Sequence, residues 1–141
     1  MKLFLISIFG LMLALFACQS KPVETASEKV SVDGGSYTNV NTGELKAMLK
    51  NKDFVFINVH IPFEGNIADT DLSIPYNQIS EPANLSQLPP DKDAKIVLYC
   101  RSGRMSEIAA ETLTKSGYTN IWNLDGGMLA WEQAGYPLQD K

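Results

Sequence analysis

The segment IVLYCRSGRMS, residues 96–106, decides the fold of this chain and the place of its chemistry. Its first four residues are apolar, which is typical of a strand buried on both faces, and a polar turn containing Gly103 follows them. After the turn, side chains suited to one helical face recur at Met105, Ile108, Ala109, Thr112 and Leu113. The segment therefore predicts a strand, a tight turn and an amphipathic helix, with Cys100 where the strand ends.

Cys100 is the candidate nucleophile. The free backbone N–H groups and the dipole at the start of a helix favour negative charge, so this position stabilises a sulfur anion. Arg101 and Arg104 flank the sulfur and favour the thiolate in the same way. The alternative is an inert core cysteine at a strand end, but a cysteine that opens a glycine-containing turn between two arginines favours a functional role.

Further strands and helices alternate around this unit. Apolar runs predict strands at residues 54–59 and 119–123, and the spacing of Asn41 and Glu44 is the signature of a helix start. A final short helix is expected at residues 128–131. Alternating strands and helices predict an α/β fold with a parallel sheet covered on both faces.

Composition limits the possible functions. The chain has 141 residues, which indicates one domain, and its 45% of hydrophobic residues is far above what a disordered chain contains. Sixteen acidic against twelve basic residues give a net charge of −4, which disfavours a nucleic-acid partner. Residues 60–90 contain five prolines and are expected to be irregular, with a short helix near residues 84–88.

The amino terminus has the pattern of an export signal. Residues 3–17 form an apolar run after Lys2 that is too short to span a bilayer comfortably. The sequence Leu15-Phe16-Ala17-Cys18 resembles the lipobox of bacterial lipoproteins, in which the cysteine carries lipid such as palmitate. We therefore expect a signal peptide at residues 1–17 and lipid on Cys18. An ordinary signal peptide that happens to contain a cysteine is the alternative.

The expected anchor sets an expected location. Residues 18–36 are rich in small and polar residues and are predicted to form a flexible tether to a domain at residues 37–141. The domain would then be held on the exported, periplasmic side of a bacterial membrane. The residue after Cys18 is Gln19 and not the aspartate that is associated with retention in the inner membrane. The outer membrane is therefore an alternative location. With lipid on Cys18, Cys100 is left as the free thiol and no intramolecular disulfide forms.

Across most of residues 37–139 the chain resembles the single-domain rhodanese-like sulfurtransferases. The cysteine loop at residues 100–106 is similar to the family's Cys-Arg-Ser-Gly-x-Arg-Ser. The segment NLDGGMLAW at residues 123–131 is similar to its Asn-Leu-x-Gly-Gly-x-x-Ala-Trp, and INVH at residues 57–60 stands where the family has Ile-Asp-Val-Arg. The resemblance implies a three-layer α/β rhodanese-like domain, with a central, mainly parallel sheet flanked by helices.

The implied chemistry is sulfur transfer through a persulfide on Cys100. The thiolate takes the sulfane sulfur of a small anionic donor such as thiosulfate and passes it to a thiol or cyanide acceptor, and no metal or organic cofactor is required. The domain is expected to be a monomer whose membrane contact is the lipid. The residues expected to cradle the persulfide and attract the donor are Arg101, Ser102, Gly103, Arg104, Met105 and Ser106.

The chain departs from the family pattern at three positions. Met105 stands where the family often has arginine, although Arg104 precedes it directly, and Asn58 and His60 replace an aspartate and an arginine. These departures leave open a second function, a module that carries persulfide or docks a partner without turnover. A phosphatase needs an arginine six positions after the cysteine to clamp phosphate, and that position is Ser106.

Other chemistry-bearing residues have simpler interpretations. His60 is the lone histidine and is interpreted as a loop or packing residue, and with no second histidine or cysteine cluster a metal site has no support. The remaining polar pairs are interpreted as solvated turns and the tryptophans as core residues. These residues are Asp69, Asp71, Asp91, Asp93, Trp122 and Trp131.

Overall fold

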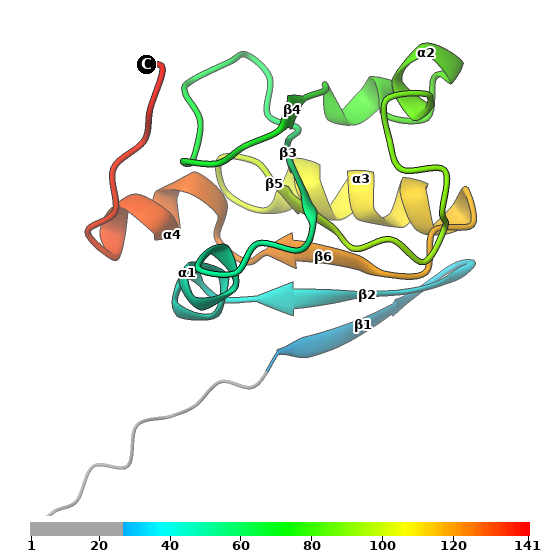
Figure 1. Ribbon diagram of the computed structural model, residues 1–141, viewed down its shortest axis with the longest axis horizontal. Helices are drawn as coiled ribbons and strands as arrows, with labels where there is room; N and C mark the ends of the chain where they lie inside the picture. Colours follow the sequence, from blue (N-terminus) through cyan, green and yellow to red (C-terminus); the bar gives the residue numbers. More distant parts are fainter. Residues whose placement is uncertain (1–26) are drawn as a thin grey trace, which may run out of the picture.

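The computed structural model describes residues 27–141, which form a six-stranded sheet with helices on both faces (Figure 1). The strands are β1 (Glu28–Val32), β2 (Gly35–Val40), β3 (Val55–Asn58), β4 (Leu72–Ser73), β5 (Ile96–Tyr99) and β6 (Ile121–Leu124). The helices are α1 (Thr42–Leu49), the 3-10 helix η1 (Tyr76–Gln78), α2 (Pro82–Leu85), α3 (Arg104–Lys115) and α4 (Gly127–Gln133).

The sheet is mainly parallel, as the sequence predicts. Its strand order is β1-β2-β6-β5-β3-β4; β1 and β2 are antiparallel, and every other neighbouring pair is parallel. Helices α1 and α4 cover one face and α3 the other, which gives three layers (Figure 1). Because β5 lies between β6 and β3, the residue that follows β5 is placed near the centre of the carboxyl edge.

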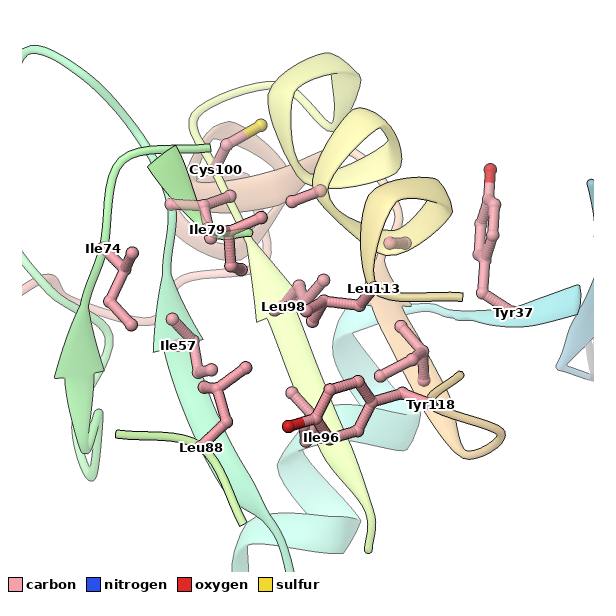
Figure 2. Close-up of a cluster of buried hydrophobic side chains, with 14 residues drawn as sticks. Tyr37, Ile57, Ile74, Ile79, Leu88, Ile96, Leu98, Cys100, Leu113 and Tyr118 are labelled. Carbon is pink, nitrogen blue, oxygen red and sulfur yellow. The ribbon is translucent and has the colours of Figure 1, made fainter. Parts of the chain in front are cut away.

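Strand β5 is apolar throughout because it is buried on both faces. Ile96 and Leu98 pack in the core beneath α3, whereas Val97 and Tyr99 pack in the core beneath α1 and α4. Cys100 continues this alternation and faces the α3 side (Figure 2). The pattern in the sequence therefore follows directly from two cores, one on each face of the sheet.

The start of the domain corrects the sequence prediction. Residues 28–36 were expected in a flexible tether, but the structure places them in the hairpin of β1 and β2 at one edge of the sheet. Only Val30 and Val32 of β1 pack against the core, so this edge strand has too little apolar sequence to reveal itself. The predicted signal peptide and Cys18 lie outside the described residues.

Local signals elsewhere in the sequence match the structure. The side chain of Asn41 accepts a hydrogen bond from the Glu44 N–H, and the Glu44 side chain accepts one from the Asn41 N–H, which makes the predicted capping box of α1. The expected short helix near residues 84–88 is α2, slightly earlier in the chain. None of the helices in residues 27–141 has the length and apolar character needed to cross a membrane.

Tyr99 connects β5 to the long loop after β3. Its buried hydroxyl accepts a hydrogen bond from the Ile67 N–H at 3.0 Å and lies 2.7 Å from the Thr70 hydroxyl. Burial raises the pKa of Tyr99 above its ordinary value of 10.0, and the hydrogen bonds to Thr70 and Ile67 oppose this only in part. The neutral phenol is therefore the form that the fold accommodates.

We expect Tyr99→Phe to lower the free energy of unfolding by about 1–3 kcal/mol at neutral pH, because the buried Ile67 N–H loses its partner. Since the folded-state pKa lies above the unfolded value, the stabilisation by Tyr99 is complete below pH about 10 and is lost as the pH rises further. Urea denaturation of the wild type and of Tyr99→Phe should give free energies of unfolding that differ less above pH about 10 than at neutral pH. A difference that grows with pH would contradict this assignment.

Candidate active site

Cys100 lies directly after β5, at the carboxyl edge of the sheet. Its side chain points away from the strands and toward the turn that leads into α3 (Figure 2). The residue is only 1% exposed, so the turn covers the sulfur.

The turn and the start of α3 give the sulfur two hydrogen-bond donors. The backbone N–H of Gly103 donates to Cys100 Sγ at 3.1 Å, and the Ser106 hydroxyl lies 3.5 Å from the same atom. The Ser106 hydroxyl also donates to the Gly103 carbonyl at 2.9 Å, so its proton is shared between two acceptors. Gly103 precedes α3 at φ +107°, a conformation that favours glycine. The turn is thus shaped to present an amide to a sulfur anion.

Helix α4 fixes the other side of the cysteine loop. The N–H of Met128 donates to the Cys100 carbonyl at 2.9 Å, and the N–H of Leu129 donates to the Arg101 carbonyl at 3.0 Å. A Cβ atom at Gly127 would lie 2.4 Å from the Cys100 carbonyl oxygen, and Gly127 has φ +57°. Gly127 in NLDGGMLAW therefore allows the close contact between α4 and the loop, whereas a Cβ atom at Gly126 would collide with Ala130 within α4.

The other loop residues make no hydrogen bond to the sulfur in the described network. Arg101, Ser102 and Arg104 are exposed. Arg101 Nε lies 3.5 Å from Glu64 Oε2, and Arg104 begins α3. Met105 is partly buried and packs against the core beneath α3, so it brings no charge to the site. Both arginines are thus exposed to solvent, and the donors to Sγ come from Gly103 and Ser106.

Asn58 holds the loop between β3 and β4 with its neutral amide. Its Nδ2 donates to the Gly65 carbonyl at 2.9 Å and to Asn66 Oδ1 at 3.0 Å, while its Oδ1 accepts from the His60 N–H at 3.0 Å. An aspartate, which donates nothing when ionised, could not make the first two bonds. The neutral residue at this position is therefore matched to the loop that it ties down.

Glu64 is a site residue that the sequence analysis missed. Its Oε2 contacts His60 Nε2 at 2.6 Å and Arg101 at 3.5 Å, which places one carboxylate oxygen between two basic side chains. The His60 side chain is largely buried, in agreement with a packing role in the loop. Only the four-residue spacing of His60 and Glu64 could have indicated their contact, and such spacing carries little weight outside a helix.

The remaining polar candidates hold turns and loops together. Asp91 accepts from the Asp93 N–H within a turn, and Asp71 accepts from Lys52 and from the Phe56 N–H. Trp131 is buried, and Trp122 packs against the same core. Within residues 27–141 no group of three or more histidine, cysteine, aspartate or glutamate side chains could hold a metal ion.

A pocket of about 330 Å³ opens beside the cysteine loop. Its walls come from the loop after β3, from Arg101, from α4 and from the carboxyl-terminal segment. Two backbone hydrogen bonds of 2.7 Å between Asn66 and Gln139 hold that segment against the loop. The pocket is thus a fixed part of the carboxyl edge of the sheet.

Comparison with known proteins identifies the family. Residues 41–134 match the rhodanese-like domain, and the chain belongs to this family. A sulfurtransferase of Allochromatium vinosum is 37% identical over 90 residues, which cover 62% of this chain and 79% of that protein.

Two further proteins resemble this chain. The tRNA uridine(34) hydroxylase of Erwinia tasmaniensis is 31% identical over 117 residues, which cover 77% of this chain but only 33% of the hydroxylase. The crystal structure of a rhodanese-related protein of Thermoplasma volcanium is 29% identical with a TM-score of 0.58, covering 71% of this chain and 95% of that one. The rhodanese-like fold expected from the sequence is confirmed.

Gly127→Ala should be far more damaging than Gly117→Ala. Both glycines have positive φ, so each alanine costs about 1–2 kcal/mol of backbone strain. The added Cβ at residue 117 meets nothing within 4 Å, whereas the one at residue 127 collides with the cysteine loop. Urea denaturation should therefore show a larger loss of unfolding free energy for Gly127→Ala. Equal losses in the two variants would show that α4 does not constrain the loop.

Proposed function

We propose that this protein is a sulfurtransferase that moves a sulfane sulfur from a donor such as thiosulfate to a thiol or cyanide through a persulfide on Cys100. The observation that carries this proposal is the 3.1 Å hydrogen bond from the Gly103 N–H to Cys100 Sγ, made at the start of a helix. The resemblance to a sulfurtransferase across most of that relative's length supports the same reaction class.

The reaction has two balanced steps. The Cys100 thiolate bonds to the outer sulfur of thiosulfate, the S–S bond of the donor breaks, and sulfite leaves with the electron pair. An acceptor thiolate or cyanide then bonds to the outer sulfur of the persulfide, and the Cys100 thiolate is released. Neither step requires a metal, an oxidant or an organic cofactor.

Loop residues supply the electrostatics of these steps. The Gly103 amide and the Ser106 hydroxyl are placed to stabilise negative charge on sulfur before the reaction starts, which avoids a reorganisation cost. Arg101 and Arg104 are exposed and attract an anionic donor to the cysteine loop.

A module that carries sulfur without turnover is the second candidate. The burial of Cys100 restricts access for small donors, and Met105 withholds the charge that an arginine would add near the sulfur. A phosphatase is disfavoured, because Ser106 occupies the position that would need a phosphate-clamping arginine, and its hydroxyl is committed to Gly103 and the sulfur.

Cys100→Ser should abolish thiocyanate production from thiosulfate and cyanide while the domain stays folded, because the serine hydroxyl is too weak a nucleophile to accept the sulfur. The rate is measured as thiocyanate formed by the full chain, and circular dichroism checks the fold. Ser106→Ala keeps the nucleophile and should retain reduced activity. Full activity in Cys100→Ser would disprove the mechanism. A one-sulfur mass increment on Cys100 without thiocyanate would support the carrier function.

We also propose that Cys18 carries lipid and holds the domain on the exported side of a bacterial membrane. The apolar run at residues 3–17 followed by the small residue Ala17 and Cys18 supports this proposal. In cells fed labelled palmitate, the wild type and Cys100→Ser should both incorporate label and sediment with membranes, whereas Cys18→Ser should do neither. Label on Cys18→Ser would refute the anchor.

A further inference from the structure

We propose that His60 is a positioning residue for the sulfur transfer: when protonated, it competes with Arg101 for Glu64 and leaves more positive charge for an anionic donor. This inference rests on the proposed function of Cys100 and adds a dependence on pH to it. It concerns a position at which the chain differs from the family pattern, since His60 stands where the family has arginine.

His60 is held beside the cysteine loop. The Val59 N–H donates to the Tyr99 carbonyl at 2.9 Å, so the chain that leads to His60 runs alongside the end of β5, next to Cys100. The His60 N–H donates to Asn58 Oδ1 at 3.0 Å, and the His60 side chain is only 8% exposed. The imidazole therefore has little freedom to turn toward solvent.

The ring of His60 has one hydrogen-bond partner within residues 27–141, and that partner is Glu64. His60 Nε2 lies 2.6 Å from Glu64 Oε2, whereas His60 Nδ1 is buried and makes no hydrogen bond there. An ionised carboxylate only accepts hydrogen bonds, so Nε2 carries the proton of the neutral ring. A second proton, taken from water, therefore binds at Nδ1, and the charge that it adds lies next to Glu64.

Glu64 connects this charge to Arg101. The oxygen that contacts His60 Nε2 at 2.6 Å also lies 3.5 Å from Arg101 Nε. With a neutral His60, the net charge of the carboxylate and the guanidinium is zero. With a protonated His60, one carboxylate faces two cations, and the three groups together carry one positive charge. The attraction of an anionic donor to Arg101 then increases.

Other charged and titratable groups surround these three residues. Lys141 and Glu132 line the pocket beside the cysteine loop and form an ion pair with each other. Arg104 is exposed at the start of α3, and arginine keeps its charge at physiological pH. Tyr76 of η1 binds through its N–H to the residue before His60, and phenols ionise only near pH about 10. Histidine, in contrast, commonly changes its charge between about pH 5 and about pH 8.

The test measures the sulfite that the reduced full chain releases from thiosulfate in a single turnover, which leaves out the acceptor step. From about pH 8 to about pH 6, the rate constant of the wild type divided by that of His60→Gln should rise about threefold, because glutamine donates to Glu64 but gains no charge. High salt should reduce this rise, since ions screen exposed charges. His60→Arg carries a fixed charge, so its rate relative to His60→Gln should stay constant.

Two controls separate an effect on the donor from an effect on the nucleophile. Iodoacetamide is uncharged, so its reaction with Cys100, followed by peptide mass, reports the reactivity of the thiolate alone. The ratio of wild type to His60→Gln for this alkylation should not change with pH. In a Glu64→Gln background, adding His60→Gln should leave the pH profile of sulfite release unchanged, because His60 acts through the carboxylate.

The outcomes separate this inference from the function on which it rests. If sulfite is released but the wild type and His60→Gln keep the same ratio at both pH values, His60 only packs the loop and the proposed function stands. A ratio that changes with pH for iodoacetamide as well would refute the inference, because His60 would then act on the thiolate.

A second variant covers the case in which His60→Gln does not fold, as judged by circular dichroism. The sulfite-release rates of the wild type and His60→Arg should converge as the pH falls, and a constant ratio between them would contradict the inference. If the wild type releases no sulfite and Cys100 gains no sulfur, both the proposed function and this inference are wrong.

Discussion

The contact between the start of α4 and the cysteine loop is the constraint on which the site depends. The N–H groups of Met128 and Leu129 bind the carbonyls of Cys100 and Arg101, and Gly127 allows the two backbones to meet. With these carbonyls bound on the α4 side, the Gly103 amide is directed at the sulfur from the α3 side. The loop is thus held between the amino ends of two helices, and both present backbone amides to it.

The loop after β3 replaces charge with amide hydrogen bonds. Asn58 and Asn66 are joined side chain to side chain, and Asn66 is bound through its backbone to Gln139. This neutral network binds Gly65 and Asn66, the two residues that follow Glu64, whose carboxylate lies beside Arg101. The two departures from the family pattern, Asn58 and His60, therefore belong to the same hydrogen-bonded loop.

The elements that could be predicted from the sequence are those that leave a pattern among neighbouring residues. The buried strand β5, the turn at Gly103, α3 and the capping box at Asn41 each leave a signal within a few residues, and all are present. Strand β1 could not be recognised, since an edge strand buries only alternate residues and Val30 and Val32 are too few to show a pattern. The contact of Glu64 with Arg101 joins two loops distant in sequence, and no local pattern encodes it.

The same geometry indicates which groups would stabilise the sulfur in the proposed reaction. Arg101 is 55% exposed in its side chain and paired with Glu64, and an exposed ion pair contributes only about 0–1 kcal/mol because water and salt screen it. A hydrogen bond to a charged group is worth about 1.5–3 kcal/mol, and the Gly103 amide is buried and already oriented. In the proposed sulfur transfer, this amide is therefore the group on which we expect a sulfur anion at Cys100 to depend most. In the same proposed reaction, the exposed Arg101 and Arg104 would act at longer range, on the encounter with an anionic donor.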